Sequence, residues 1–309
     1  MGEALTDVLR LQMRRILSYL LLLLSFAFSS LLHAYTVELD GLCYNFIGPY
    51  AYVTSRGMTA EEQSGYVGDL VVPEQIEYNG KKYEVIYVDN NAFANCEALT
   101  SVSLPSSVRQ IGACTFLGCT ALRQVSLPAS LMLSSCTFTG CTSLQGITMP
   151  RQSKLIDTLT YYCCASLTSI VLPHRIRTVC QGGLEHLPSL RNLYCFSSVP
   201  PVAESGAFTP SDQKRCTLHV PKDVLQKYKQ SPGWGDFYRI VPLEDADYLQ
   251  MNYKRGDVND DGRVDAEDLS LVRQVIVGKP DPDAVNWAAD INEDGIVNAV
   301  DYVTLAKRL

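Results

Sequence analysis

A segment of about 23 residues that recurs through the middle of the chain is the feature that most constrains its fold. Between residues 91 and 200, the pattern Phe-x-x-Cys-x-x-Leu-x-x-Val-x-Leu-Pro occurs four times, and a fifth copy is weaker. The central leucines of the copies, spaced by 23, 22, 23 and 23 residues, are Leu99, Leu122, Leu144, Leu167 and Leu190. A fixed period in the low twenties predicts a solenoid, in which each turn is one short strand plus a return segment.

Four columns of residues recur at fixed distances from these leucines, and we predict that they point into the solenoid. The column six residues before the leucine holds Phe93, Phe116, Phe138, Tyr161 and Leu184. The column three residues before it holds Cys96, Cys119, Cys141, Cys164 and Leu187. The column three residues after it holds Val102, Val125, Ile147, Ile170 and Leu193. The column five residues after it holds Leu104, Leu127, Met149, Leu172 and Cys195.

The segment Leu-x-x-Val-x-Leu is too short and too rich in β-branched residues for a helix, so it predicts a strand. The proline that follows cannot donate a hydrogen bond to a sheet, and it therefore ends the strand. One repeat buries too few side chains to offset the entropy of ordering its backbone, so neighbouring repeats must stack. Small or polar residues alternate with the inward columns and form a candidate contact surface: Ser101, Ser103, Gln124, Ser126, Gly146, Thr148, Ser169 and Val171.

The repeat resembles the BspA-like, Treponema-type leucine-rich repeats of bacterial surface proteins over roughly residues 70 to 245. This resemblance implies a mainly β solenoid of right-handed stacked rungs with a cap at each end. We expect an N-terminal β cap at 35–90, the solenoid at 91–200, a C-terminal cap at 201–246, a linker at 247–255 and a small all-α domain at 256–309. The sequence departs from the repeat pattern after Leu167.

The caps carry signals of their own. Alternating apolar residues around Asn79-Gly80 predict a β-hairpin in the N-terminal cap. A strand, a short helix after Pro221 and a cluster of aromatic residues are expected in the C-terminal cap. The alternative for Trp234, Phe237 and Tyr238 is an aromatic platform that binds a ligand.

The N-terminal region has the composition of a secretory signal peptide. Met13-Arg14-Arg15 precedes an uncharged apolar run from 16 to 32, and the cleavage point is expected near Ala34. Either Met1 or Met13 could be the start, and a retained membrane anchor is the alternative to cleavage. We expect a secreted or cell-surface protein whose mature chain does not span the membrane.

The chain contains eleven cysteines, and an exported protein meets oxidising conditions in which disulfides form. Four of these cysteines occupy one inward column, where cysteine behaves as a small apolar residue. We therefore expect mostly free, buried thiols. A bond between Cys114 and Cys136 on adjacent rungs is the alternative.

Residues 257–268 and 290–301 form two acidic twelve-residue segments, the second starting 33 residues after the first. Both place oxygen-bearing side chains at positions 1, 3, 5, 9 and 12 and glycine at position 6, where a calcium loop turns sharply. Position 7 would supply its backbone carbonyl. The candidate ligands to two Ca²⁺ ions are Asp257, Asn259, Asp261, Arg263, Asp265 and Asp268 in the first loop and Asp290, Asn292, Asp294, Ile296, Asn298 and Asp301 in the second.

Each loop is followed by an apolar helical stretch, its twelfth residue is Asp, and Lys279-Pro280-Asp281-Pro282 precludes a full helix before the second loop. Residues 256–309 thereby resemble a type I dockerin. The resemblance implies a module that folds on calcium and docks onto a cohesin domain of a scaffold or surface protein. The contact positions that it implies, which differ between the two copies, are Ala266, Glu267, Ala299 and Val300.

Charge and motifs limit the function classes. The formal net charge is −7, and residues 256–309 hold twelve acidic and five basic residues, which argues against a nucleic-acid partner. The sequence contains no Gly-x-Ser-x-Gly, His-Glu-x-x-His or Walker motif, so we assign no catalytic residue. We expect a non-enzymatic adhesion protein whose solenoid binds a host protein or a glycan. The alternatives are an accessory component of a polysaccharide-degrading complex and a spacer without a ligand.

Overall fold

The computed structural model describes residues 35–57, 65–260, 262–279, 286–294 and 296–309. The predicted signal peptide therefore lies outside the described residues. Within the described part of the chain, no helix is both long enough and apolar enough to cross a membrane.

The N-terminal cap is a mixed sheet with the strand order β1-β2-β3-β6-β5, and β8 also pairs with β6. Its strands are β1 (Val37–Leu39), β2 (Leu42–Ile47), β3 (Tyr50–Thr54), β5 (Gln75–Tyr78), β6 (Lys81–Val88) and β8 (Gln110–Ile111). β5 and β6 are antiparallel, and the two residues between them, Asn79 and Gly80, have φ angles of 51° and 72°. Two left-handed residues make the turn that suits a two-residue hairpin, so the predicted hairpin is confirmed.

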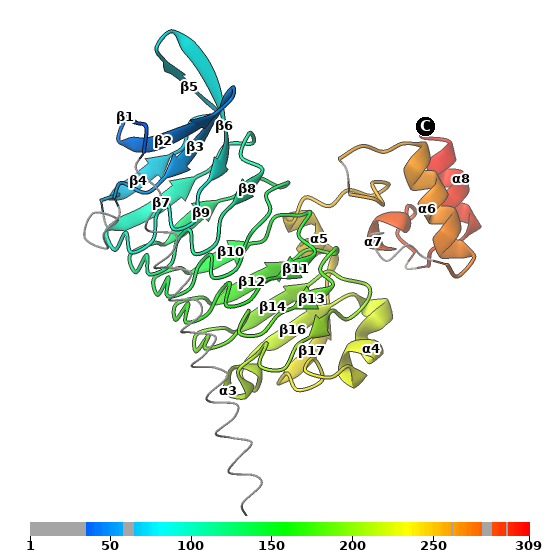
Figure 1. The fold of residues 1–309 in the computed structure, drawn as a ribbon. Coiled ribbons are helices and arrows are strands. Elements are labelled where there is room, and N and C mark those ends of the chain that lie inside the picture. Colours follow the sequence, from blue (N-terminus) through cyan, green and yellow to red (C-terminus); the bar gives the residue numbers. More distant parts are fainter. Residues whose placement is uncertain (1–34, 58–64, 261, 280–285, 295) are drawn as a thin grey trace, which may run out of the picture.

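The solenoid that follows is built from parallel strands stacked rung upon rung (Figure 1). One face carries a sheet of β4 (Gly68–Val71), β7 (Leu99–Ser103) and β9 (Gln124–Ser126), then a sheet of β10 (Gly146–Thr148), β12 (Ser169–Leu172), β14 (Asn192–Cys195), β16 (Thr217–Val220) and β17 (Arg239–Pro242). A further sheet contains β11 (Leu155–Ile156), β13 (Thr178–Val179) and β15 (Val202–Ala203). Because β4 precedes residue 91 and β16 and β17 follow residue 200, the stack is longer than the repeats alone predict.

The predicted inward columns form the core. Phe93, Phe116, Phe138 and Tyr161 are fully buried, and their rings stack with centroids 5.3, 5.4 and 5.6 Å apart. The adjacent cysteine column is equally buried. The thiols of Cys119, Cys141 and Cys164 donate to the carbonyl oxygens of the aromatic column one rung earlier, as in the 2.9 Å contact from Cys119 Sγ to Phe93 O. A small side chain with a weak donor therefore fits this column well.

Two members of the other columns are less buried than predicted. Val125 and Leu127 are only half-buried, although both pack against the core. They lie on and just after β9, where the ladder between β9 and β10 is interrupted and a surface groove opens.

The C-terminal cap contains α3 (Pro210–Gln213), a 3₁₀ turn η1 (Lys222–Val224) and α4 (Leu225–Gln230). Trp234 is fully buried and its Nε1 donates to the carbonyl oxygen of Pro201 at 2.6 Å, and Phe237 is also buried. Tyr238 is exposed. Trp234 and Phe237 thus belong to the core, which contradicts the alternative of an aromatic platform at these two residues.

None of the eleven cysteines, all of which lie in the described part of the chain, forms a disulfide in this structure. Cys114 and Cys136, the pair considered for a disulfide, lie close enough for their thiols to hydrogen-bond. Both are buried, and both adopt positive φ angles, of 57° and 56°.

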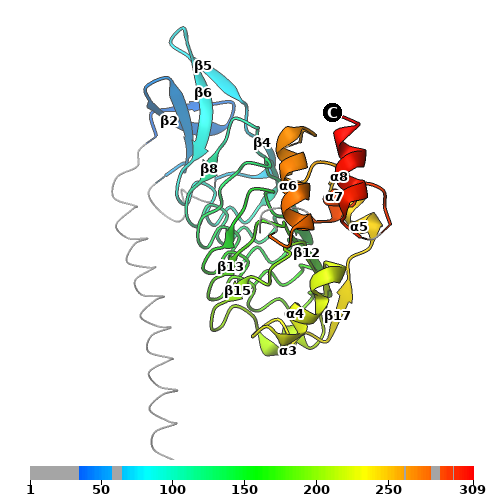
Figure 2. The same ribbon diagram turned by 90° about the vertical axis from the view of Figure 1, so that its right-hand side faces the viewer.

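The C-terminal module is helical: α5 (Asp245–Gln250), α6 (Ala266–Ile276), α7 (Asn286–Ala289) and α8 (Ala299–Ala306). Figure 2 shows α6 and α8 side by side. α5 occupies part of the segment expected to be a linker. A second hydrophobic core joins this module to the solenoid, because Tyr248 and Tyr253 contact Phe196 with ring centroids 5.1 and 5.2 Å apart.

Candidate metal centre

The twelfth residue of each acidic loop ties the loop together. In the second loop, Asp301 Oδ1 accepts hydrogen bonds from the backbone N–H groups of Ile291 at 2.8 Å and Asn292 at 3.2 Å, and Oδ2 accepts one from Asn298 at 2.8 Å. Asp268 makes the same three contacts in the first loop, with Val258, Asn259 and Asp265. Both aspartates are fully buried. Each carboxylate therefore joins the start of its loop to the helix that follows.

The ninth residue of each loop caps that helix. Asp265 Oδ1 accepts from Glu267 N at 2.9 Å at the start of α6, and Asn298 Oδ1 accepts from Val300 N at 2.7 Å at the start of α8. Together with the twelfth residues, they form a capping box at each helix. The first turn of each helix is thus fixed by the same residues that were predicted as ligands.

The first residue of each loop is buried beside the turn. Asp257 Oδ2 accepts from Gly262 N at 3.0 Å, and Gly262 has the φ angle of 91° expected for the sixth position. Asp290 is buried at the equivalent place in the second loop. Asp261 lies outside the described residues, and Arg263 is exposed.

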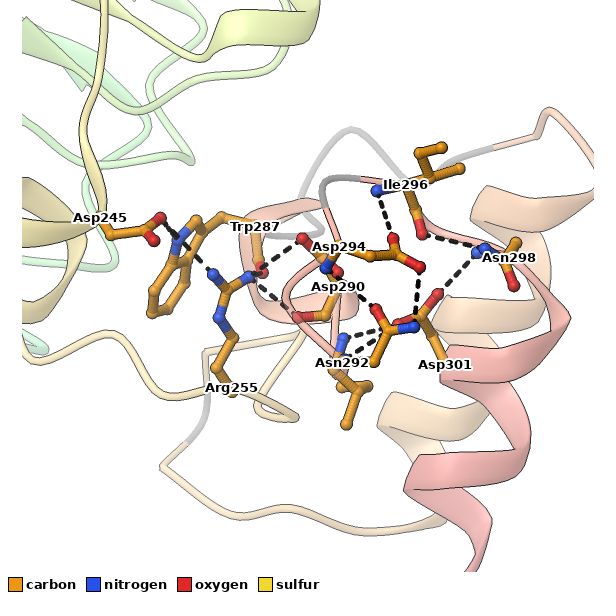
Figure 3. Close-up of polar contacts among 10 residues, drawn as sticks. Asp245, Arg255, Trp287, Asp290, Asn292, Asp294, Ile296, Asn298 and Asp301 are labelled. Atoms are coloured by element: carbon orange, nitrogen blue, oxygen red, sulfur yellow. Dashed lines mark hydrogen bonds and ion pairs between the residues drawn. The ribbon is translucent and has the colours of Figure 1, made fainter.

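In the second loop, positions 3, 5, 7 and 9 face one another (Figure 3). Asn292 Nδ2 donates to Asp294 Oδ2 at 2.8 Å, and Asp294 Oδ1 accepts from Ile296 N at 2.9 Å. Asn298 Nδ2 donates to the carbonyl oxygen of Ile296 at 3.3 Å. Alternate positions of the loop therefore bring their oxygen-bearing groups to one side.

This donor set suits a hard cation. It consists of carboxylate, amide and backbone oxygens, the groups that Ca²⁺ prefers, and it includes neither thiol nor imidazole. Among the described residues, no three His, Cys, Asp or Glu side chains form a cluster that could hold a metal. Three of the second loop's six predicted ligands, Asn292, Ile296 and Asn298, would bind the metal through amide or backbone oxygens. These ligands are therefore not part of a cluster of His, Cys, Asp or Glu side chains.

Arg255, which the sequence analysis missed, lies against the second loop. Its Nη1 donates to Asp290 O at 2.9 Å and lies 3.7 Å from Asp290 Oδ2. Its guanidinium lies 3.9 Å from the centre of the Trp287 ring, and Trp287 Nε1 donates to Asp245 at 2.8 Å. Arg255 thus connects the second loop to α5, as Figure 3 shows.

Asp260, at position 4 of the first loop, contacts the solenoid. Its carboxylate accepts from Arg151 Nε at 2.9 Å and also from the Nη2 of the same residue. His174 Nδ1 lies 3.7 Å from Asp260 Oδ2, and Arg175 Nη2 donates to the carbonyl oxygen of Asn259 at 3.0 Å. We call this set of contacts the interdomain clamp.

The clamp is a desolvated site. The Asp260 side chain is 2% exposed, and burial raises its pKa to about 6 although Arg151 opposes that shift. Tyr253 completes the site, because its ring lies 4.6 Å below the Arg151 guanidinium and its hydroxyl lies 3.3 Å from His174 Nδ1. The counterpart of Asp260 in the second loop, Glu293, is exposed.

The four predicted partner-contact residues, Ala266, Glu267, Ala299 and Val300, are all exposed in the first turns of α6 and α8. The two helices differ in character. α8 and its loop expose Ile296, Val300 and Val303, which fall on one face of a helix, whereas the equivalent residues before and along α6 are Arg263, Glu267 and Ser270.

Comparison with protein families divides the chain in the same way. The model of the BspA type leucine rich repeat region matches residues 86–213 in six copies. The dockerin type I domain matches residues 255–309. The chain therefore combines a BspA-type leucine-rich repeat region with a type I dockerin domain.

Solved structures of leucine-rich repeat proteins resemble the chain. The Treponema pallidum leucine-rich repeat protein is 23% identical, with a TM-score of 0.48 over 71% of this chain and 96% of that one. A leucine-rich repeat protein from Bacteroides ovatus is 19% identical, with a TM-score of 0.34 over 67% of each chain. A leucine-rich cell surface protein from Faecalibacterium prausnitzii is 14% identical, with a TM-score of 0.36 over 67% of this chain and 72% of that one. No curated protein matches the chain.

The two matching families have known general properties. Type I dockerin domains typically bind calcium, and a dockerin implies a cohesin partner. Both families are typically non-catalytic, and their members are usually extracellular or on the cell surface. A role in protein interaction follows for this chain.

Proposed function

We propose that the chain is a secreted, non-enzymatic binding protein. Its dockerin domain takes up two Ca²⁺ ions and docks onto a cohesin domain of a scaffold or surface protein, while its solenoid binds a host protein or a glycan. The observation that carries the proposal is the doubled loop. Both copies repeat the same capping box and the same burial of the first and twelfth residues, within a stretch that matches a dockerin.

Calcium would be held by the six residues assigned to each loop. The bound ions would neutralise carboxylates that otherwise repel one another at short range. Asp268 and Asp301 already hold their loops closed through backbone N–H groups, so these two residues pre-organise the sites as well as contributing to them.

The cohesin partner would bind the face of α8. The exposed side chains of Ile296, Val300 and Val303 give an apolar strip, which is the kind of surface that marks a protein contact. The matching face of α6 is polar. The two halves of the dockerin, each a loop with its helix, therefore present different surfaces, and a cohesin domain cannot bind both halves in the same way. We infer that docking uses the second half.

A pull-down from the source cell envelope, with and without a calcium chelator, tests the proposal. We expect a cohesin-bearing protein to be captured only when calcium is present. Val300→Asp should abolish capture because it buries a charge in the contact, while Ser270→Asp, on the matching face of α6, should leave capture unchanged. Equal capture by both variants would contradict the assignment to α8.

A further inference from the structure

A groove of about 960 Å³ crosses the strand-lined face of the solenoid. Its floor comes from β9, β10, β12 and β14, and its wall comes from α5 and the residue after it, through Asp247, Gln250 and Met251. The groove is thus shared between the solenoid and the segment that leads to the dockerin. Six of the residues predicted as a contact surface line it: Gln124, Ser126, Gly146, Thr148, Ser169 and Val171.

The polar part of the floor is uncharged and follows the rungs. Gly146, Ser169 and Asn192 are paired in register on three successive strands, and Gln124 occupies the corresponding position on β9. Gly146 has no polar side chain, so this row supplies the amide of Gln124, the hydroxyl of Ser169 and the amide of Asn192, and the last two lie on paired strands about 4.8 Å apart. Such groups both donate and accept hydrogen bonds.

The second row of the floor changes from polar to aromatic along the groove. Thr148, Val171 and Tyr194 are paired in register, with Ser126 at the corresponding position on β9. The Tyr194 ring stacks on His219 with centroids 4.3 Å apart, and His219 Nε2 lies 3.0 Å from Asn192 Oδ1. These contacts fix the orientation of an aromatic side chain at one end of the groove.

The charged residues that line the groove are engaged by the protein itself. Arg151 binds Asp260 in the interdomain clamp, and Arg191 Nη1 donates to two backbone carbonyls at 3.1 and 3.0 Å. Asp247 Oδ2 accepts from Glu244 N at 2.8 Å. In these contacts Arg191 and Asp247 bind only backbone groups and keep charges of opposite sign, so the described lining residues do not favour a phosphorylated or strongly ionic ligand of either sign.

An extended peptide is disfavoured for a separate reason. The strands β10, β12 and β14 use their backbone groups in the parallel ladder, so a peptide could gain main-chain hydrogen bonds only at the facing edges of β9 and β10, and over the rest of the floor no such bond is open to a ligand. Recognition must come from hydroxyl and amide side chains spread over several rungs, together with an aromatic surface.

We propose that this groove binds a neutral oligosaccharide. The ligand class follows from the lining: uncharged hydrogen-bonding groups on successive rungs match a chain of hydroxyl-bearing rings, and Tyr194 supplies the apolar contact. The inference rests on the proposed recognition role of the solenoid and assigns that role to a place and a ligand class.

Screening the full chain with calcium against an array of neutral and acidic glycans, followed by calorimetry on the hits, tests the proposal. Thr148→Trp fills the groove from an exposed position, and we expect it to weaken binding of a neutral glycan at least tenfold. Ser103→Trp is the matched control, because it lies on the same face outside the groove and should bind as the parent chain does.

Three results would overturn the proposal: no neutral glycan bound at millimolar concentration, preference for acidic glycans, or unchanged binding by Thr148→Trp. In another outcome, the chain binds a protein and no glycan, and Thr148→Trp abolishes that binding. This result would refute the proposed ligand class but would support recognition by the solenoid. Cohesin docking, measured in parallel, separates these outcomes from failure of the dockerin assignment, since neither substitution touches residues 256–309.

Discussion

Replacing Asp260 with alanine is expected to release the dockerin from the solenoid. Asp260 is the residue of the first loop that reaches Arg151, and its carboxylate is nearly inaccessible to water. The substitution leaves Arg151 partly desolvated over the Tyr253 ring without its anion. Position 4 has no predicted role in calcium binding, so the effect can be measured at saturating calcium.

The magnitude follows from the burial of the two partners. Removing one partner of a fully buried ion pair costs about 3–5 kcal/mol, because the other charge is left without compensation. The Arg151 side chain is 25% exposed, so water would compensate part of its charge after the substitution. We therefore expect the interface to lose about 1.5–3 kcal/mol, the range for hydrogen bonds to charged groups.

A double-mutant cycle on the full chain measures this energy. Urea unfolding of Asp260→Ala, Arg151→Ala and the double variant should give an interaction energy of about 1–3 kcal/mol between the two residues. Small-angle scattering should show a larger radius of gyration for Asp260→Ala than for the parent chain. Both effects depend on the clamp, not on calcium.

Glu293→Ala is the matched control, since Glu293 is the exposed counterpart of Asp260 in the second loop. It should change the free energy of unfolding by less than about 0.5 kcal/mol. Equal effects of Asp260→Ala and Glu293→Ala, or an interaction energy near zero with Arg151, would refute the clamp.

Three further predictions concern stability. Phe116→Ala should lower the free energy of unfolding by about 3–5 kcal/mol because it removes the middle ring of the aromatic stack, and a near-neutral result in chemical denaturation would contradict the stack. Asp301→Ala should remove calcium-dependent helicity of the second half, measured by circular dichroism, since three backbone N–H groups lose their acceptor; retention of the parent spectrum would argue against that role. Burial lowers the pKa of His219, so the unfolded chain binds more protons than the folded chain at mildly acidic pH. The free energy of unfolding should therefore fall as the pH decreases through about 6.5. His219→Gln should flatten this pH dependence, and an unchanged slope would assign the dependence to other groups.

The solenoid core could be predicted because its sequence carries two superposed periods. The rung repeat aligns Phe116 with Phe138, and alternation along each strand separates the inward Ile170 from the outward Ser169. The extent of the stack was harder to predict. β4 and β16 pair with repeat strands and β17 pairs with β16, yet their sequences lack the Phe-x-x-Cys pattern, so only their packing reveals them as rungs.

The two acidic loops could be predicted because their ligand spacing is local. The interdomain clamp could not, since Arg151 and Asp260 are separated by 109 positions and neither belongs to a recurring pattern. Arg255 was missed for a related reason: an arginine before an acidic loop is an ordinary charge neighbour until the structure places it against Trp287 and Asp290. The groove is predictable only in part: the repeat predicts the strands of its floor, but no sequence pattern predicts that α5 forms its wall.

Calorimetric titration of Ca²⁺ into the full chain tests whether the doubled loop of the dockerin holds metal. We expect two ions to bind, one to be lost with either Asp257→Ala or Asp290→Ala, and both to be lost with the double variant. Absence of calcium binding by the parent chain, or unchanged stoichiometry in the double variant, would contradict the assignment of the two loops as calcium sites.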